Sequence, residues 1–309
     1  MIATIAAHTI RPRPPFSFAQ ALAFLNRFPP TQGERVILQD AVLGAARAGG
    51  QTVGFRVEEA GSVEAPALRC TLHPKVTQPG QLDSITTQAI LARIGDWLGA
   101  GDDLAPFYAL AESDPPFWAV VQRLYGYHQV RFFTPFENTC WAILGQRTPF
   151  GAARAAKRGL MEQYGGAAEV EGHTILGFPE PDDLVGASSQ ELAALVGSER
   201  KADRLLGAAR AFVEAGPAAL RSMPTDELGP WLQALPGIGP WSVAFILLRG
   251  FGRADTPLPL GTAQAFDREL LQAGRTVYGA DLSEERLAEI AARYGAERGS
   301  WGHYLRVAG

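Results

Sequence analysis

The 309-residue sequence has little cysteine: Cys70 and Cys140 are the only two, and they form no C-x-x-C pair. This excludes a disulfide-built scaffold and a metal site made from cysteine clusters. Long apolar runs are also missing, because no stretch approaches the ~20 residues of a membrane helix and residues 1–8 lack the basic start of a signal peptide. We therefore expect a reduced, cytoplasmic protein of about two domains that has no membrane partner.

A positive net charge is missing as well. The 28 Lys and Arg residues against 32 Asp and Glu residues give a formal charge of −4. This balance argues mildly against a protein that coats nucleic acid by bulk charge, although a local basic face fits inside a near-neutral total. The hydrophobic content of 47% excludes disorder as the main state.

The pattern of residues along the sequence changes near residue 80. Residues 1–80 combine one segment of helical spacing, 18–28, with short strand-like runs at 35–38, 51–58 and 67–72, separated by turn residues. Residues 81–309 are rich in Ala and Leu at helical spacing. Helices are predicted at 89–98, 117–125, 136–144, 151–164, 189–196, 201–215, 225–234 and 284–294. The prediction is an α+β N-terminal domain with a small antiparallel sheet over 1–80, followed by an all-α array over 81–309.

The most informative motif is Leu235-Pro-Gly-Ile-Gly-Pro-Trp-Ser-Val-Ala-Phe245. Gly237 and Gly239, separated by Ile238, lie between one predicted helix and a second that starts near Pro240. This spacing predicts a tight hairpin whose backbone N–H groups point outward at a helix N-terminus, where an anion such as a phosphate binds without side-chain charge. The alternative is an ordinary helical hairpin with glycine at the C-cap.

Together with four other pieces, this motif makes the chain resemble the helix-hairpin-helix DNA glycosylases, in particular the 3-methyladenine DNA glycosylase II type (AlkA-like). The mixed N-terminal part resembles that family's small α+β domain, and the helix-hairpin-helix falls at about 232–250. The other matching segments are 142–146, Lys201-Ala-Asp203 and 301–304, and Leu248-Arg-Gly250 follows the hairpin as part of the same piece. Each piece is weak alone, but their order along the chain is specific.

The resemblance implies a base-excision DNA repair enzyme, a hydrolase that flips an alkylated purine out of duplex DNA and cuts its N-glycosidic bond. Trp241, Phe245 and Trp301 match positions of an aromatic base pocket, where a cationic damaged base stacks on electron-rich rings. The partner implied is double-stranded DNA, with no nucleotide cofactor, a monomeric state, and a location on the nucleoid when bound. The residues matched to DNA contacts are Gly237, Ile238, Gly239, Gln146, Arg147 and Lys201.

Single residues indicate the subclass that the resemblance implies. Relatives that also nick the strand have a Schiff-base lysine at the position of Trp241, and tryptophan cannot act as that nucleophile. A monofunctional enzyme that uses water is therefore expected. Endonuclease III-like relatives bind an iron–sulfur cluster through cysteines near the C-terminus, whereas this chain has no cysteine after Cys140.

The catalytic residue breaks the family pattern. The family's catalytic aspartate lies about two dozen residues after the hairpin, and a gap-free count places Gly261 there. The nearest carboxylates, Asp255 and Asp267, are the candidates to replace it, and the alternative is that Asp255 is a loop residue and Asp267 a helix-surface charge. Two functional classes stay open: a glycosylase of reduced or altered activity, and a catalytically impaired protein that binds DNA lesions or duplex DNA.

Arg147 is a second departure, because relatives place an apolar wedge there to fill the gap left by a flipped base. Its stem and guanidinium plane suit that role, and a phosphate contact or a surface charge is the alternative. Residues 117–166 hold four more basic than acidic side chains, so this segment is either the DNA face or a solvated helix face. No histidine or cysteine spacing indicates a metal site, although carbonyls of the hairpin leave room for a monovalent or divalent cation.

Overall fold

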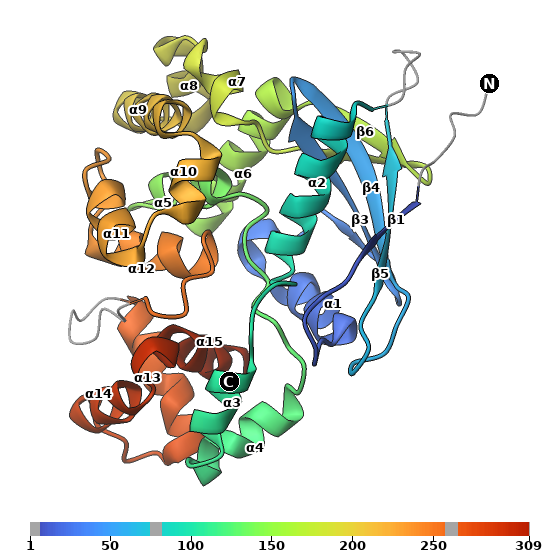
Figure 1. The fold of residues 1–309 in the computed structure, drawn as a ribbon. Helices are drawn as coiled ribbons and strands as arrows, with labels where there is room; N and C mark the ends of the chain where they lie inside the picture. Colours follow the sequence, from blue (N-terminus) through green and yellow to red (C-terminus); the bar gives the residue numbers. More distant parts are fainter. Residues whose placement is uncertain (1–6, 75–81, 257–264, 309) are drawn as a thin grey trace.

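A five-stranded antiparallel sheet forms one side of the computed structural model, which describes residues 7–74, 82–256 and 265–308 (Figure 1). The spatial order of the strands is β1-β5-β4-β3-β2. Gly49 and Gly50, both with positive φ, close the hairpin between β3 and β4. The strands are β1 (Ala7–Ile10), β2 (Val36–Ile37), β3 (Ala41–Ala48), β4 (Gln51–Glu59) and β5 (Leu68–His73).

Strand β3 did not stand out in the sequence because half of its residues are alanine and no β-branched alternation is present. Its side chains are buried on both faces of the sheet, so small residues fit where larger ones would clash. A Cβ at Gly44 would lie 2.3 Å from the ring of Phe55, its partner on β4. The face of the sheet that carries Leu43 and Ala45 is covered by a second, two-stranded sheet. Its strands are β6 (Ala167–Val170) and β7 (His173–Leu176).

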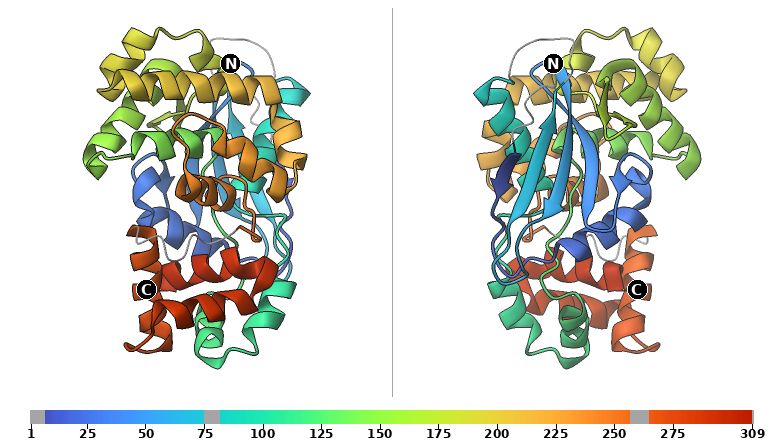
Figure 2. Two further views of the ribbon diagram at one scale, coloured as in Figure 1. Left: turned by 90° about the vertical axis from the view of Figure 1, so that its left-hand side faces the viewer. Right: turned by 90° about the vertical axis from the view of Figure 1, so that its right-hand side faces the viewer.

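The rest of the chain is helical, and each predicted helix is present within a few residues. Figures 1 and 2 show two groups, with α3, α4 and α13 to α15 at one end and α5 to α12 at the other. The helices of ten or more residues are α1 (Phe18–Arg27), α2 (Ser84–Trp97), α5 (Pro135–Leu144), α6 (Phe150–Leu160), α9 (Glu199–Ala215), α12 (Pro240–Arg249), α13 (Ala265–Tyr278), α14 (Glu284–Arg293) and α15 (Arg298–Ala308). The shorter ones are α3 (Ala105–Ala111), α4 (Pro115–Arg123), α7 (Pro181–Val185), α8 (Ser189–Val196), α10 (Pro217–Ser222) and α11 (Thr225–Gln233).

The fold class is therefore as predicted: an α+β region followed by an array of helices. Like β3, strand β1 and the β6–β7 hairpin were not indicated by the sequence pattern. One hydrophobic cluster joins the sheet to α1 to α4 and α13 to α15, and a second cluster lies among α5 to α12. The last helices, α13 to α15, thus pack in the same hydrophobic cluster as the N-terminal sheet. The boundary near residue 80 stays a prediction.

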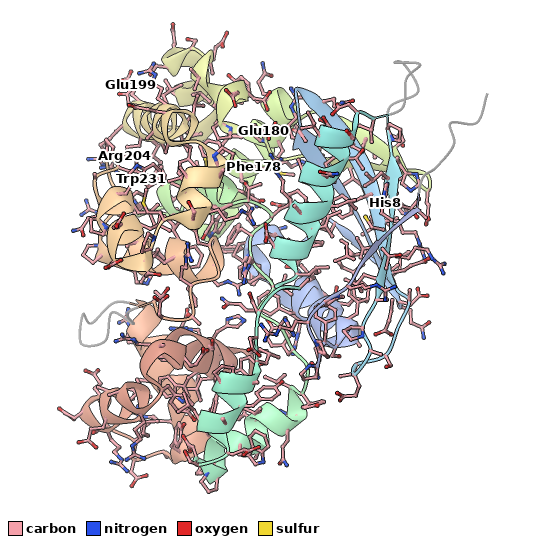
Figure 3. The ribbon with its side chains drawn as sticks, in the orientation of Figure 1. His8, Phe178, Glu180, Glu199, Arg204 and Trp231 are labelled. Atoms are coloured by element: carbon pink, nitrogen blue, oxygen red, sulfur yellow. The ribbon has the colours of Figure 1, made fainter. Side chains whose placement is uncertain are left out.

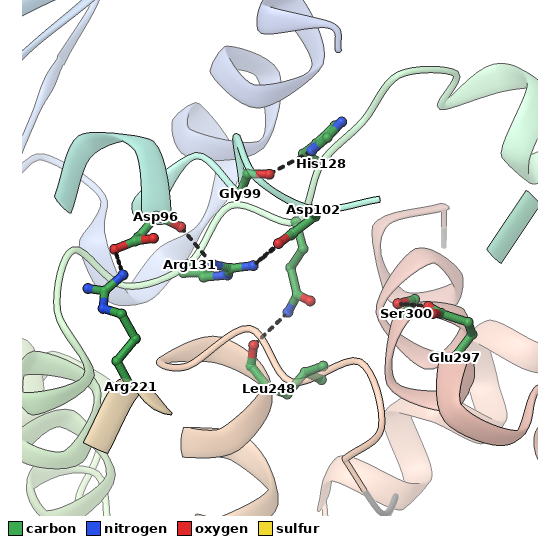
Figure 4. Close-up of polar contacts among 10 residues, drawn as sticks. Asp96, Gly99, Asp102, His128, Arg131, Arg221, Leu248, Glu297 and Ser300 are labelled. Carbon is green, nitrogen blue, oxygen red and sulfur yellow. Dashed lines mark hydrogen bonds and ion pairs between the residues drawn. The ribbon is translucent and has the colours of Figure 1, made fainter. Parts of the chain in front are cut away.

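A connecting segment between α4 and α5 ties the two groups together at the end of α12. Gln129 donates from Nε2 to the carbonyl of Leu248 over 3.1 Å, and the N–H of Phe132 donates to the carbonyl of Arg249 over 2.8 Å. Figure 4 shows the contacts of this region, including the ion pair between Arg131 and Asp102. These bonds fix the last turn of α12.

Candidate functional site

Helices α11 and α12 flank the turn 234–239 and form the predicted hairpin. Gly237 has φ +88°, a left-handed conformation that favours glycine. A Cβ there would also lie 2.5 Å from Nε of Arg204, whose guanidinium packs against the turn from α9 (Figure 3). Gly239 is the N-cap residue of α12 and supplies no side-chain acceptor to its first turn. The first N–H groups of α12 are thus arranged as in an anion site.

Ile238 does not fit its predicted DNA contact. Its side chain is 4% exposed and packs in the α5–α12 cluster, and its N–H donates to the carbonyl of Leu235 over 3.0 Å. Burial of this isoleucine, which lies between two glycines, anchors the turn to the hydrophobic cluster of α5 to α12.

The loop after α5, which carries Gln146 and Arg147, lies directly against this turn. Gln146 donates from Nε2 to the carbonyl of Gly237 over 2.6 Å and accepts from Nη1 of Arg204 over 2.8 Å. Lys201 donates from Nζ to the carbonyl of Leu144 over 2.6 Å and to Thr148 Oγ1. The structure therefore brings the predicted DNA residues Gln146, Lys201 and Gly237 together.

Arg147 lies exposed at the tip of this loop with φ +50°, which is uncommon for a residue with a side chain. Burial lowers the pKa of the neighbouring Lys201, and the cations Arg204 and Arg200 lower it further. A local excess of positive charge thus surrounds the loop and the hairpin turn.

The basic surplus predicted for 117–166 is not one surface. Lys157 is fully buried between Glu34 and Glu137, and Arg131 is 8% exposed and paired with Asp102. Arg158 pairs with Glu162. Counting charges along the chain did not reveal these pairings, because Glu34 and Asp102 come from outside the segment. The cations beside the hairpin come mainly from α9 instead.

A pocket of about 440 Å³ opens beside α12, between α1, α13 and α15. Trp241 and Phe245 lie one turn apart on α12 and both line it, with parallel rings whose centroids are 5.2 Å apart. Two of the three predicted pocket aromatics are therefore together. The full lining is Phe24, Arg27, Phe28, Pro29, Trp241, Phe245, Leu248, Arg249, Glu269, His303, Arg306 and Val307.

The third predicted aromatic, Trp301, does not line this pocket. Its side chain is fully buried, stacks on Tyr294 and donates from Nε1 to the hydroxyl of Tyr278 over 3.0 Å. The prediction that it faces the cleft is wrong because the opposite face of α15 does so. His303 and Val307 hold that position.

Arg249 and His303 are buried residues that line the pocket. Arg249 lies over the rings of Phe24 and Phe28, with its Cζ 4.8 Å and 4.6 Å from their centroids. Its Nη1 is 3.3 Å from Nε2 of His303, which is also 2.9 Å from the hydroxyl of Tyr127. Burial, together with the positive charge of Arg249, holds the pKa of His303 well below its usual range, so that the ring is neutral at pH 7.

Neither carboxylate predicted from the sequence is among the described residues that line the pocket. Asp255 is exposed, accepts a hydrogen bond from Thr225 Oγ1 over 2.9 Å, and does not line the pocket. Gly261 lies outside the described residues, and so does the side chain of Asp267, although its backbone belongs to the first turn of α13. Within the described part of the chain, Glu269 on α13 is the carboxylate that lines the pocket.

Lysines are rare in this chain: the sequence holds three, Lys75, Lys157 and Lys201. Lys157 is enclosed by its two glutamates, and Lys201 is bound to the loop after α5. Lys75 lies outside the described residues. No lysine is among the described residues that line the pocket.

Residues 140–295, about half of the chain, match the family model described as HhH-GPD superfamily base excision DNA repair protein. The chain belongs to this superfamily. The match spans the loop after α5, the hairpin and α13, whereas α1 and α15, which also line the pocket, lie outside it. The recognition of a helix-hairpin-helix glycosylase from the sequence is confirmed.

Two characterised relatives share part of the sequence. The DNA-3-methyladenine glycosylase of Bacillus subtilis is 27% identical over 175 residues, covering 56% of this chain and 57% of the relative. The DNA-3-methyladenine glycosylase 2 of Escherichia coli is 31% identical over 124 residues, covering 40% and 44%. The chain thus spans about half the length of these relatives.

Solved structures share the fold along the whole chain. The 3-methyladenine DNA glycosylase of Archaeoglobus fulgidus has a TM-score of 0.73 at 19% identity and covers 97% of both chains. The 8-oxoguanine glycosylase/lyase of Clostridium acetobutylicum, bound to double-stranded DNA, has a TM-score of 0.65 at 15% identity, covering 98% of this chain and 96% of that one. At these identities the likeness shows the fold.

Membrane-spanning helices and clusters of metal-binding side chains are both absent from the described residues. No helix within 7–74, 82–256 and 265–308 has the length and apolar character needed to cross a membrane. In the same residues, no three His, Cys, Asp or Glu side chains are grouped as metal ligands. The hairpin cation stays a prediction, and the carbonyl of Gly237 already accepts from Gln146.

Proposed function

We propose that this protein is a monofunctional DNA glycosylase that extrudes an alkylated purine from duplex DNA and hydrolyses its N-glycosidic bond. The observation that carries this proposal is the stacked pair of Trp241 and Phe245 on a pocket wall, which begins two residues after the hairpin turn 234–239. Membership of the base-excision superfamily and the names of the two characterised relatives support the same activity.

Duplex DNA binds across the hairpin and the loop after α5 in this proposal. The first-turn N–H groups of α12 take one phosphate, and Arg200 and Arg204 on α9 supply positive charge beside it. Arg147, exposed at the loop tip, enters the duplex and fills the gap that the extruded nucleotide leaves. Gln146 keeps this loop against the hairpin, so phosphate binding and base extrusion act at a fixed separation.

The extruded base then enters the pocket and stacks on Trp241. An alkylated purine with a positive ring is attracted by the electron-rich face of the indole. Such a base is also a good leaving group, because breaking the glycosidic bond removes its charge. This lowers the demand on the protein's catalytic residues.

The hydrolysis needs water and a carboxylate that stabilises the cationic sugar or takes the proton of the water. We propose that α13 supplies it: Glu269 lines the pocket, and Asp267 lies two residues earlier on the same helix. Lyase chemistry needs an amine nucleophile. The engagement of Lys157 and Lys201 elsewhere supports a monofunctional enzyme.

The experiment is base release from methylated duplex DNA by the purified full-length protein, followed by chromatography of the free bases. Trp241→Ala is expected to lower the rate by about 10-fold to 100-fold, since stacking of one base on an aromatic side chain contributes ~1–3 kcal/mol. Trp118→Ala, on α4 away from the pocket, is the matched control. Duplex binding without release favours the lesion-binding alternative, and absence of both contradicts the proposal.

A second comparison identifies the carboxylate. Glu269→Gln, Asp267→Asn and Asp255→Asn each remove one negative charge with little change in shape. The proposal expects release to fall by at least 10-fold in one of the first two and to stay unchanged in Asp255→Asn, whose carboxylate is bound to Thr225. A loss confined to Asp255→Asn contradicts the assignment to α13.

A further inference from the structure

Lys201 lies in the first turn of α9, where the helix itself offers its positive charge no favourable partner. Its backbone N–H donates to Oγ of Ser198, the N-cap residue, over 3.3 Å. The first turn of a helix carries a partial positive charge that disfavours cations, and Arg200 and Arg204 add positive charge nearby. The contacts that favour a lysine at this position therefore come from another part of the chain.

These contacts lie at the two ends of the loop after α5, residues 145–149. Nζ of Lys201 donates to the carbonyl of Leu144, the last residue of α5, over 2.6 Å, and to Oγ1 of Thr148. Carbonyls in the last turn of a helix lack partners within the helix and attract cations. The ammonium group thus joins the start of the loop to its end.

The loop between these two contacts holds Arg147 in a left-handed backbone conformation. Its φ of +50° is disfavoured for a residue with a side chain. Thr148 closes the turn, since its N–H donates to the carbonyl of Gly145 over 3.4 Å and its hydroxyl donates to the carbonyl of Gln146 over 3.0 Å. The same hydroxyl accepts from Lys201. The ammonium group therefore supports the turn that sets the direction of Arg147.

We propose that Lys201 is a positioning residue, which fixes Arg147 for insertion into the duplex and does not itself bind a phosphate. Two of the three donors of its ammonium group are already used by the loop. This role differs from the DNA contact that the family resemblance implied. The inference rests on the proposed function, because it requires that Arg147 enters DNA, and it deepens that function by separating the roles of the cations on α9.

The positioning role and a phosphate contact affect different steps. When Arg147 is misdirected, the duplex still binds to the amides of the hairpin and to the charge of Arg200, but the gap in the base stack stays open. The extruded base then returns to the duplex, so its release slows even at saturating protein. Loss of a phosphate contact instead lowers the affinity and its dependence on salt.

The experiment compares Lys201→Met with the unmodified full-length protein. Fluorescence anisotropy measures duplex affinity at several salt concentrations, and single turnovers at saturating protein measure base release from methylated duplex DNA. Release is expected to fall by about 10-fold to 100-fold, since misplacement of a group by ~1 Å is enough for a loss of this size. The slope of log affinity against log salt is expected to stay unchanged, whereas loss of one phosphate contact would lower it by ~0.9.

Arg200→Met is the matched control for charge, because it removes the same charge from the neighbouring residue of α9. Arg200 is exposed, and the proposed function gives it an electrostatic role beside the hairpin. Its loss is expected to weaken duplex affinity and to lower the salt slope. A Lys201→Met variant that lowers the salt slope in the same way overturns the positioning role.

Thr148→Val reaches the same contact from the loop and changes no charge. It removes the hydroxyl that accepts from Lys201, so release is expected to fall while the salt slope stays unchanged. The double variant is expected to lose less than the product of the two single losses, because both remove one contact. Independent losses that multiply overturn the inference. If Lys201→Met does not fold, Thr148→Val decides alone, and unchanged release in it overturns the inference.

The outcomes are separable from those of the proposed function. If the unmodified protein releases no base, the proposed hydrolysis fails, and a duplex with 2-aminopurine opposite an abasic-site analogue replaces the release assay. Insertion of a side chain unstacks the neighbouring bases and raises the fluorescence of 2-aminopurine. A rise that Lys201→Met abolishes at equal affinity supports the positioning role. An equal rise with both proteins, or none with either, overturns it.

Discussion

Gln146 donates a hydrogen bond from its side-chain amide to the carbonyl of Gly237 over 2.6 Å. The bond joins two segments 91 residues apart, the loop that carries Arg147 and the turn of the helix-hairpin-helix. The amide oxygen of Gln146 accepts from Arg204, so one side chain holds α9, the loop and the hairpin in register. Phosphate binding and base extrusion are thereby mechanically linked in the proposed enzyme.

Gln146→Ala tests this link. The variant loses two hydrogen bonds at a partly exposed position, each contributing roughly 0.5–1.5 kcal/mol, so a small loss of stability is expected. Base release is expected to fall by more than duplex affinity, because the hairpin still binds phosphate while Arg147 loses its position. Single-turnover release and fluorescence anisotropy measure the two effects. Gln122→Ala, an exposed change on α4, is the control, and equal losses of rate and affinity contradict the link.

Gly237→Ala and Gly239→Ala form a matched pair in one turn. Gly237 has φ +88° and lies against Arg204, whereas Gly239 has φ −94° and open space where a Cβ would lie. Gly237→Ala is expected to cost about 1–3 kcal/mol of unfolding free energy from backbone strain and the clash. Gly239→Ala is expected to cost about 1 kcal/mol or less. Urea unfolding compares them, and equal costs would show that the turn is not strained at residue 237.

Local sequence pattern predicted much of the fold. Helix spacing, strand runs and the glycine pair at 237 and 239 depend on neighbours a few residues away, and these predictions held. The strand β3 escaped because its alanines fit a strand only when both of its faces are buried. The β6–β7 hairpin is short, and it depends on packing against β3 and β4.

The pocket could be predicted only in part, because its lining residues come from helices that are far apart in the sequence. Trp241 and Phe245 are four residues apart on one helix, so their stacking follows from helical periodicity. Trp301 was misplaced because the direction in which α15 turns its aromatic face is set by packing against α4, α13 and α14. No site role was assigned to Glu269 or Arg249 from the sequence, and only the fold brings them to one pocket.

Lys157 belongs to the basic segment 117–166, but it is buried in ion pairs with Glu34 and Glu137. Its Nζ lies 2.6 Å from Oε1 of Glu137 and 2.8 Å from Glu34, with almost no solvent exposure. Lys157→Met is expected to cost about 3–5 kcal/mol, because Glu137 stays buried without its partner. The double variant Lys157→Met with Glu137→Leu is expected to recover part of this loss. Arg158→Ala breaks an exposed pair and should cost less than ~1 kcal/mol by urea unfolding, and a larger effect there would contradict the distinction.

His303 gives the fold a dependence on pH. Burial and the charges of Arg249 and Arg306 keep the pKa of its ring well below 6.5 in the folded state. The unfolded chain therefore binds the proton first as the pH falls below 6.5, and stability is lost by about 1.4 kcal/mol per pH unit from this group. His303→Gln is expected to remove that contribution, so the loss of unfolding free energy between pH 7.5 and 5.5 becomes smaller than in the unmodified protein. His173→Gln changes an exposed histidine on β7 and should leave the difference intact. An unchanged pH dependence in His303→Gln means that the ring takes up its proton without breaking the buried contact with Arg249.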